Sequence, residues 1–263
     1  MELRGATALI TGATGGIGRS LVQAFAAQGC KLILSSRSRE ALEELAGRHG
    51  GRAIVADLAQ PGEPERLVEQ ARDADLVVAN AALPASGPLE SFSLEELDRA
   101  LAVNLRAPVV MARLFAPLLA ARGQGHLLFV GSLSGRAATP YSSLYNATKF
   151  GLRGFALALR AELAERGVGV SVVEPGFVRE AGMFAKSGAK LPPLIGTVSP
   201  DQVARAAVDA VKANRGEVTV APPLLKAATA FAALAPGIAE RVVGLTGGAG
   251  IARSVAAGQR EMR

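Results

Sequence analysis

Thr11-Gly12-Ala13-Thr14-Gly15-Gly16-Ile17-Gly18 directly follows a short apolar run and opens a longer stretch with helical spacing of apolar residues. Glycines at a strand-to-helix turn let the chain turn tightly, bring backbone N–H groups close to a pyrophosphate and let the helix pack closely on a sheet. The helix N-terminus adds positive potential where the phosphates would lie. A glycine cluster alone is also compatible with a simple tight turn, but this position in the chain favours a dinucleotide-binding turn.

Beyond this stretch, short apolar runs rich in β-branched residues alternate with longer helical patterns. The predicted strands are Thr7–Ile10, Lys31–Leu34, Ala53–Ala56, Leu76–Ala79, His126–Val130, Val170–Val173 and Glu217–Val220. The predicted helices are Gly16–Gln28, Arg39–Arg48, Pro64–Arg72, Leu94–Ala121, Ser143–Arg166 and Pro200–Asn214. Continuously apolar strands that are each followed by a helix predict an α/β fold, a doubly wound parallel seven-stranded sheet (Rossmann-like) with helices on both faces.

Length and composition limit the classes of protein to which the chain can belong. Its 263 residues, 49% of them hydrophobic, fit one large domain with a sizeable core and argue against disorder. A single cysteine, Cys30, excludes an internal disulfide, and the two histidines, His49 and His126, are far apart, so we predict no metal site. The net charge is +6 without a Lys/Arg run, which disfavours nucleic-acid binding. The N-terminus lacks a signal-peptide pattern, which predicts a cytoplasmic location.

Two segments depart from the alternation of strands and helices. Residues 176–199 form a long insertion within the domain spanning residues 1–221, and a loop of this length is often a lid or binding loop. Residues 222–263 form a tail of unknown role, with helical patterns at Leu224–Ala235 and Ile238–Leu245. Its apolar part is too short to span a bilayer and is most simply a helix docked on the domain or on a second subunit. A membrane-surface helix is the alternative, although basic residues do not line one face.

The end of the second predicted strand bears on the choice between two nicotinamide cofactors. An acidic residue there would bind the 2′-hydroxyl of the NAD ribose, but Leu34-Ser35-Ser36-Arg37-Ser38 contains none. The planar guanidinium of Arg37 suits a phosphate instead. Arg37 beside Ser36 therefore favours NADP(H), with NAD(H) as the alternative.

Tyr145 and Lys149 are four residues apart on a predicted helix, so both lie on one face. An ammonium beside a phenol favours the phenolate and is expected to lower the tyrosine's pKa. A tyrosine tuned in this way exchanges protons near neutral pH. Ser132, on a separate element, has a hydroxyl that can orient a carbonyl or alcohol oxygen. Tyr141 and Ser134 are weaker alternatives, since Tyr141 is eight residues from Lys149.

Asn104 precedes a proline in a helical pattern. Pro108 has no backbone N–H, so the carbonyl of Asn104 lacks its usual partner four residues on. A carbonyl freed in this way can hold a water molecule.

In these motifs the chain resembles the short-chain dehydrogenase/reductase family, in its single-domain form, from about residue 5 to residue 221. The family's catalytic four match Asn104, Ser132, Tyr145 and Lys149, and the resemblance implies that Asn104 supports a water relay to the lysine. The cofactor contacts that it implies are Gly12, Thr14, Gly15, Gly16, Ile17, Gly18, Ser36, Arg37, Asp57, Leu58, Asn80, Ala81, Ala82, Tyr145, Lys149, Pro175, Gly176 and Val178. The sequence departs from the family at Ala79 and Ala82, and at Arg179-Glu180, where a threonine is usual.

The resemblance implies an NADP(H)-dependent oxidoreductase that interconverts a ketone or aldehyde and an alcohol. The residues expected to make an apolar substrate pocket are Leu83, Leu133, Tyr141, Phe177, Met183, Phe184, Leu191 and Leu194. A 3-oxoacyl thioester reductase and a non-catalytic dinucleotide-binding regulator are the alternatives. The resemblance also implies a homo-oligomer, a dimer or tetramer formed through Leu94–Ala121 and Ser143–Arg166.

Overall fold

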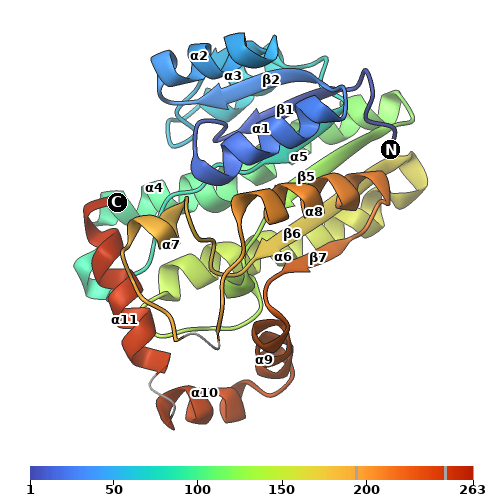
Figure 1. Ribbon diagram of the computed structural model, residues 1–263. Coiled ribbons are helices and arrows are strands. Elements are labelled where there is room, and N and C mark those ends of the chain that lie inside the picture. Colours follow the sequence, from blue (N-terminus) through green and yellow to red (C-terminus); the bar gives the residue numbers. More distant parts are fainter. Residues whose placement is uncertain (193–194, 246–247, 263) are drawn as a thin grey trace.

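A single parallel sheet organises the chain in its computed structural model, which describes residues 1–192, 195–245 and 248–262 (Figure 1). Its strands are β1 (Thr7–Thr11), β2 (Lys31–Ser36), β3 (Arg52–Val55), β4 (Leu76–Ala79), β5 (Gly125–Val130), β6 (Val168–Pro175) and β7 (Glu217–Val220). They are ordered β3-β2-β1-β4-β5-β6-β7, with every neighbouring pair parallel. The strand order reverses between β1 and β4, which opens a crevice at their carboxyl ends. All seven predicted strands are confirmed.

Helices cover both faces of the sheet and create two hydrophobic cores. One face carries α1 (Gly16–Ala27), α2 (Arg39–His49) and α8 (Pro200–Lys212), whose apolar side chains pack with alternate strand residues such as Ile10 and Leu34. The opposite face carries α3 (Glu63–Gln70), α5 (Ala107–Ala121) and α6 (Ser143–Leu163). Because successive strand residues point to opposite faces, both sides of each central strand are buried. The doubly wound Rossmann-like fold is confirmed.

The predicted helix Leu94–Ala121 is interrupted. It consists of α4 (Leu94–Leu101), a π-helical turn η2 (Ala102–Arg106) and α5. The N–H of Ala107 bonds the carbonyl of Ala102, and Pro108 cannot donate to Asn104, so the turn widens where the sequence frees that carbonyl. By length and composition this segment could cross a membrane, but one face of α5 packs in the core. It is a core helix of the α/β fold.

The insertion between β6 and α8 is only partly regular. It contains the short helix α7 (Met183–Lys186) and a bridge between Val178 and Val198. The rings of Phe177 and Phe184 lie 4.9 Å apart between centroids, so the segment has an apolar cluster of its own. Leu194, one of the predicted pocket residues, lies outside the described residues. The remaining short helices are η1 (Leu89–Ser91), η3 (Leu133–Gly135), η4 (Ala164–Arg166) and η5 (Arg260–Met262).

The tail is helical and returns to the domain. Both predicted tail helices are confirmed as α9 (Pro223–Leu234) and α10 (Pro236–Leu245), while α11 (Gly248–Gln259) was not predicted. Figure 1 shows α9 and α10 projecting beyond the sheet and α11 running back toward α7. A Cβ on Gly258 would come 1.9 Å from the carbonyl oxygen of Ser187, so α11 touches the insertion backbone to backbone.

Candidate active site

The predicted cofactor residues gather at the carboxyl edge of the sheet. They lie after β1 (Gly12, Thr14, Gly15, Gly16, Ile17, Gly18), at the end of β2 (Ser36, Arg37), after β3 (Asp57, Leu58), after β4 (Asn80, Ala81, Ala82) and at the end of β6 (Pro175, Gly176, Val178). Carboxyl ends of parallel strands at a switch point are where doubly wound sheets bind ligands. The structure therefore brings this set together along one edge of the sheet.

The glycine turn has the form that a pyrophosphate requires. Gly12 has φ +63°, and a Cβ there would lie 2.8 Å from Cα of Ala81, so the turn admits only glycine. A Cβ on Gly18 would lie 2.1 Å from the carbonyl oxygen of Gly12, which keeps α1 tight against the turn. No side chain caps α1 at Gly15, and its first turn carries no acidic residue. The first N–H groups of α1 are thus available to an anion, and these residues fit a dinucleotide.

Thr11 is a functional residue that sequence reasoning missed. Its hydroxyl donates to the carbonyl of Val78 (3.3 Å) and accepts from the N–H groups of Asn80 and Ala81, both at 3.1 Å. The Asn80 amide in turn donates to the carbonyls of Thr11 (2.9 Å) and Gly12 (3.2 Å). These bonds lock the ends of β1 and β4 to each other. The threonine directly before the glycines is the sequence feature that could have indicated this role.

Arg37 stands exposed immediately after β2, and no ion pair to it is found in the described part of the chain. Arg39, two residues on, pairs instead with Glu43 at 3.1 Å. Ser36 is buried at the end of the strand. Arg37 is therefore the guanidinium at this strand end that remains free for a ligand.

Ser132, Tyr145 and Lys149 meet, as the sequence predicts. Ser132 follows β5 and caps η3, and its side chain is close enough to the phenol of Tyr145 on α6 to act on the phenol's pKa. The Ser132 hydroxyl also accepts from the N–H of Ser134 (3.1 Å), so Ser134 contributes its backbone. Lys149 is buried one turn after Tyr145, and its Nζ donates to the carbonyl of Val130 at 3.0 Å. The serine and the tyrosine thus form a hydroxyl pair, with the lysine beside it.

The prediction that the pKa of Tyr145 is lowered is wrong for the protein without ligands. Burial raises the pKa of Tyr145 to about 12, and the Ser132 hydrogen bond only partly opposes it. Burial also lowers the pKa of Lys149 to about 8. The ammonium lies 5.7 Å from the centroid of the tyrosine ring and is engaged by Val130. Desolvation therefore outweighs the charge of the lysine, and the phenol stays protonated at neutral pH.

Asn104 is fully buried in the π-helical turn η2. Its side-chain oxygen accepts from the N–H of Leu83 (2.7 Å), and its side-chain nitrogen donates to the carbonyl of Leu83 (2.9 Å). The side chain thus pins the loop that follows β4, while the carbonyl freed by Pro108 is a separate group. A role in a water relay stays a prediction.

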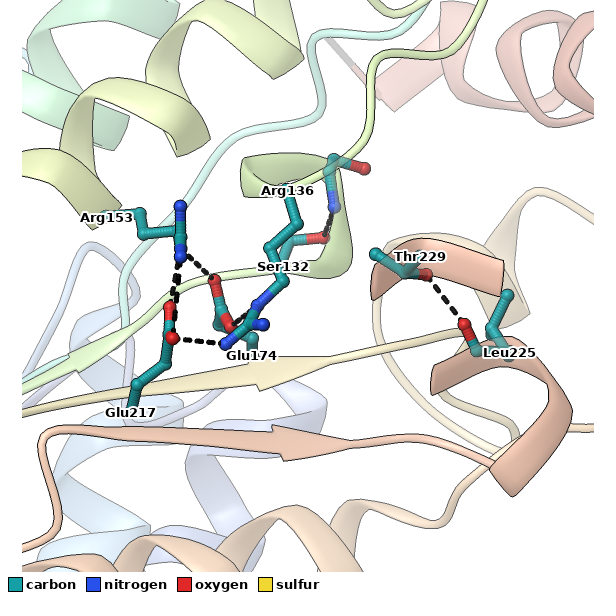
Figure 2. Close-up of polar contacts among 8 residues, drawn as sticks. Ser132, Arg136, Arg153, Glu174, Glu217, Leu225 and Thr229 are labelled. Atoms are coloured by element: carbon teal, nitrogen blue, oxygen red, sulfur yellow. Dashed lines mark hydrogen bonds and ion pairs between the residues drawn. The ribbon is translucent and has the colours of Figure 1, made fainter. Parts of the chain in front are cut away.

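A buried ion-pair network lies beneath the turn that begins at Ser132 (Figure 2). Glu174, fully buried at the end of β6, pairs with Arg136 just after η3 and lies 3.5 Å from Nε of Arg153 on α6. Both arginines also pair with Glu217 on β7 at 2.5 Å. Burial raises the pKa of Glu174 to about 7 against the opposing arginines. The network joins the turn that begins at Ser132 to three other elements.

Known proteins resemble this chain in sequence. The family model described as short chain dehydrogenase matches residues 6–192. A ketoacyl reductase, HetN from Nostoc sp., is 34% identical over 227 residues, covering 83% of this chain and 79% of its own. The chain belongs to the short-chain dehydrogenase family. As a short-chain dehydrogenase it is an oxidoreductase that acts on alcohol and ketone groups of small molecules with a nicotinamide dinucleotide.

Solved structures of other short-chain dehydrogenases share the fold. One from Sphingobium yanoikuyae, in complex with NADPH, aligns with a TM-score of 0.76 at 27% identity, covering 92% of this chain and 95% of its own. A 3-ketoacyl-(acyl-carrier-protein) reductase from Brucella melitensis, complexed with NADH, has a TM-score of 0.73 at 29% identity, covering 83% and 97%. The two relatives hold different nicotinamide cofactors.

In the described part of this chain, no cluster of three or more His, Cys, Asp or Glu side chains comes together that could hold a metal ion.

Proposed function

We propose that this short-chain dehydrogenase uses NADP(H) to interconvert a ketone or aldehyde and an alcohol on an apolar or lipid-like substrate. The observation that carries the proposal is the meeting of Ser132, Tyr145 and Lys149 at the carboxyl end of β5, beside the glycine turn. The chemistry that a bound nicotinamide supplies is hydride transfer to or from the carbon bearing the oxygen.

The residues of the chain supply a proton and hold the substrate oxygen in place. Tyr145 is protonated at neutral pH, so it is poised to donate its proton to the developing alkoxide of a carbonyl that is being reduced. The Ser132 hydroxyl, close to the phenol, orients that oxygen at the same point. Lys149 adds positive charge as the phenolate forms, which lowers the energy of the charge-separated state. In oxidation the same groups act in reverse.

The preference for NADP(H) rests on Arg37 and on the absence of an acidic residue at the end of β2. An exposed guanidinium without an ion-pair partner in the described structure offers a planar fork to a 2′-phosphate. The NADPH complex of the Sphingobium relative is compatible with this preference, and the NADH complex of the Brucella relative leaves NAD(H) as the alternative.

The proposed substrate class rests on the apolar side chains that the sequence predicts for the substrate pocket. Leu133 immediately follows Ser132, and the insertion adds the paired rings of Phe177 and Phe184. Tyr141, in the loop before α6, presents its ring beside the Arg253 guanidinium of α11, 5.3 Å from the ring centroid. Apolar side chains with one polar anchor are the usual lining of a small-molecule site.

A 3-oxoacyl thioester reductase is the second candidate, because HetN and the Brucella relative carry ketoacyl reductase names. The two candidates differ in substrate alone. A panel of free ketones, aldehydes and 3-oxoacyl thioesters, each assayed with NADPH and with NADH, separates them. We expect NADPH-dependent reduction of apolar ketones, and turnover confined to thioesters would favour the second candidate. Absence of turnover with every carbonyl and cofactor would contradict the proposal.

We also propose a cytoplasmic homo-oligomer, a dimer or tetramer. Leu94 at the start of α4 and Phe150 on α6 are large apolar side chains that are exposed in the isolated chain, on the two helical segments expected to form the interface. Light scattering on the purified chain tests the assembly, since a monomer at all concentrations would exclude it. Fractionation of cells tests the location.

A further inference from the structure

The surface formed by α9 and the start of α10 carries exposed apolar side chains. Four large apolar side chains between residues 224 and 238 are exposed: Leu224 by 50%, Phe231 by 47%, Leu234 by 87% and Ile238 by 56%. No ionisable residue occurs between Lys226 and Glu240. We call residues 224–238 the apolar corner. Neighbouring exposed apolar residues of this size mark a binding surface rather than ordinary scatter.

The apolar corner is not a core face left open by chance, because α9 already has an inner face. Thr229 is buried, and its hydroxyl donates to the carbonyl of Leu225 at 2.7 Å (Figure 2). A Cβ on Gly176 would lie 3.1 Å from Cδ2 of Leu225, so this face packs against the end of β6. Leu224, Phe231 and Leu234 point away from that contact. The packing of α9 on the domain thus leaves a second apolar face without an intramolecular role.

Basic residues outnumber acidic ones in α7, its following loop and the tail helices. Residues 183–192 together with 222–260, which make up α7 with its following loop and the tail helices, contain six basic residues and one acidic residue. The basic residues are Lys186, Lys190, Lys226, Arg241, Arg253 and Arg260, all exposed, and the acidic residue is Glu240. The resulting charge of +5 compares with +6 for the whole chain. The excess positive charge therefore lies in these segments, and Lys226 and Arg241 are the basic residues in or next to the apolar corner, although no single helix face carries the charge.

We propose that the apolar corner docks on the surface of an anionic phospholipid bilayer. Figure 1 shows α9 and α10 projecting beyond the sheet, so a flat surface can reach them without meeting the rest of the domain. Apolar side chains enter the boundary between headgroups and acyl chains, while surrounding Lys and Arg side chains bind the anionic headgroups. A second copy of this chain would bring the same basic residues against each other, which electrostatics disfavours. The proposal does not depend on the substrate of the active site.

The test uses the full chain and two vesicle compositions, phosphatidylcholine alone and phosphatidylcholine with phosphatidylglycerol. We expect co-sedimentation with the anionic vesicles that weakens as salt is added. The double variant Phe231→Ser/Leu234→Ser should weaken binding by at least about tenfold through lost apolar burial. Lys226→Gln/Arg241→Gln should weaken it by about tenfold through lost charge. Leu89→Ser is the matched control, because Leu89 is 54% exposed but lies on η1, away from the apolar corner and from the proposed oligomer interface.

Each contrary result has a distinct meaning. Failure of the wild-type chain to bind anionic vesicles overturns the proposal. Binding that the Phe231/Leu234 double variant leaves unchanged, with circular dichroism confirming its fold, also overturns it. If vesicles are not bound and that double variant instead dissociates an oligomer seen by light scattering, the apolar corner belongs to a second copy. These readouts are independent of turnover, so they do not overlap with the tests of the proposed function.

Discussion

At the scale of single residues, the proposed chemistry depends on a half-buried tyrosine, Tyr145, and a buried lysine, Lys149. With the pKa of Tyr145 raised to about 12 and that of Lys149 lowered to about 8, both groups are destabilised in their charged forms. The spacing predicted that Tyr145 and Lys149 lie together, as they do, but it predicted the wrong direction for the shift of the tyrosine pKa. A sequence shows which side chains share a helix face, whereas burial and the competing Val130 carbonyl are tertiary properties.

The proposed preference for NADP(H) also depends on a single residue, Arg37. Its replacement by Glu should lower kcat/KM for NADPH by at least about tenfold, because a charge-assisted hydrogen bond contributes roughly 1.5–3 kcal/mol. The same change should spare NADH. Arg39→Ala serves as the control, since Arg39 is engaged with Glu43. Steady-state kinetics with both cofactors decides, and an equal effect of Arg37→Glu on NADPH and NADH would argue against a 2′-phosphate contact.

At the scale of elements, ion pairs of Glu174 and Glu217 with Arg136 and Arg153 join β6, β7 and α6 to the turn that begins at Ser132. Arg136→Met should lower the free energy of unfolding by about 3 kcal/mol, because it leaves a buried carboxylate short of a partner. Arg72→Met removes an exposed pair with Glu69 and should change it by less than about 1 kcal/mol. Urea denaturation compares the two variants. Equal effects would mean that the buried network does not stabilise the turn.

The contact between α11 and the insertion depends on a glycine. Gly258→Ala would place a Cβ against the backbone at Ser187 and should separate α11 from α7, which we expect to expose the tail to limited proteolysis. Gly250, in the same helix, has open space around it, so Gly250→Ala should instead stabilise α11 by roughly 0.5–1 kcal/mol. Matching digestion patterns for the two variants would show that the tail does not pack on the insertion.

Elements were predictable where burial leaves a periodic pattern. All seven strands followed from apolar runs such as Leu76–Ala79, which the structure buries on both faces. The π-helical turn was not predicted as such, although Pro108 marked its position. The helix α11 is rich in Gly and Ala and has no strong apolar stripe, so its pattern could not reveal it. Glu174 likewise gave no signal, because its partners come from distant parts of the sequence.

The molecule as a whole carries a buried histidine far from the active site, at the amino end of β5. Burial lowers the pKa of His126 to about 3, and its Nε2 lies 2.8 Å from the Ser171 hydroxyl. A depressed pKa contributes stability above the unfolded value near 6.5 that is lost as pH falls toward 3. Glu174, whose pKa is raised, has the opposite effect: its contribution to stability is lost as the pH rises from about 4.5 to about 7.

Replacement of His126 by Asn should therefore reduce the loss of unfolding free energy at acid pH. We expect the free energy of unfolding of the wild type to fall by a few kcal/mol more than that of His126→Asn between pH 6.5 and pH 3. Urea denaturation across this range measures both profiles. Parallel profiles would mean that His126 titrates alike in the folded and unfolded chains.

Tyr145→Phe tests the central claim most directly, that the chain reduces a carbonyl by proton donation from this phenol. With a substrate that the wild type reduces, kcat should fall by at least about a hundredfold, because a positioned acid contributes 10²–10⁴ in rate. NADPH affinity should stay near the wild-type value, and Tyr141→Phe, which alters the only other tyrosine, should retain kcat. The measurement is NADPH oxidation followed by nicotinamide absorbance. Undiminished turnover by Tyr145→Phe would contradict the account.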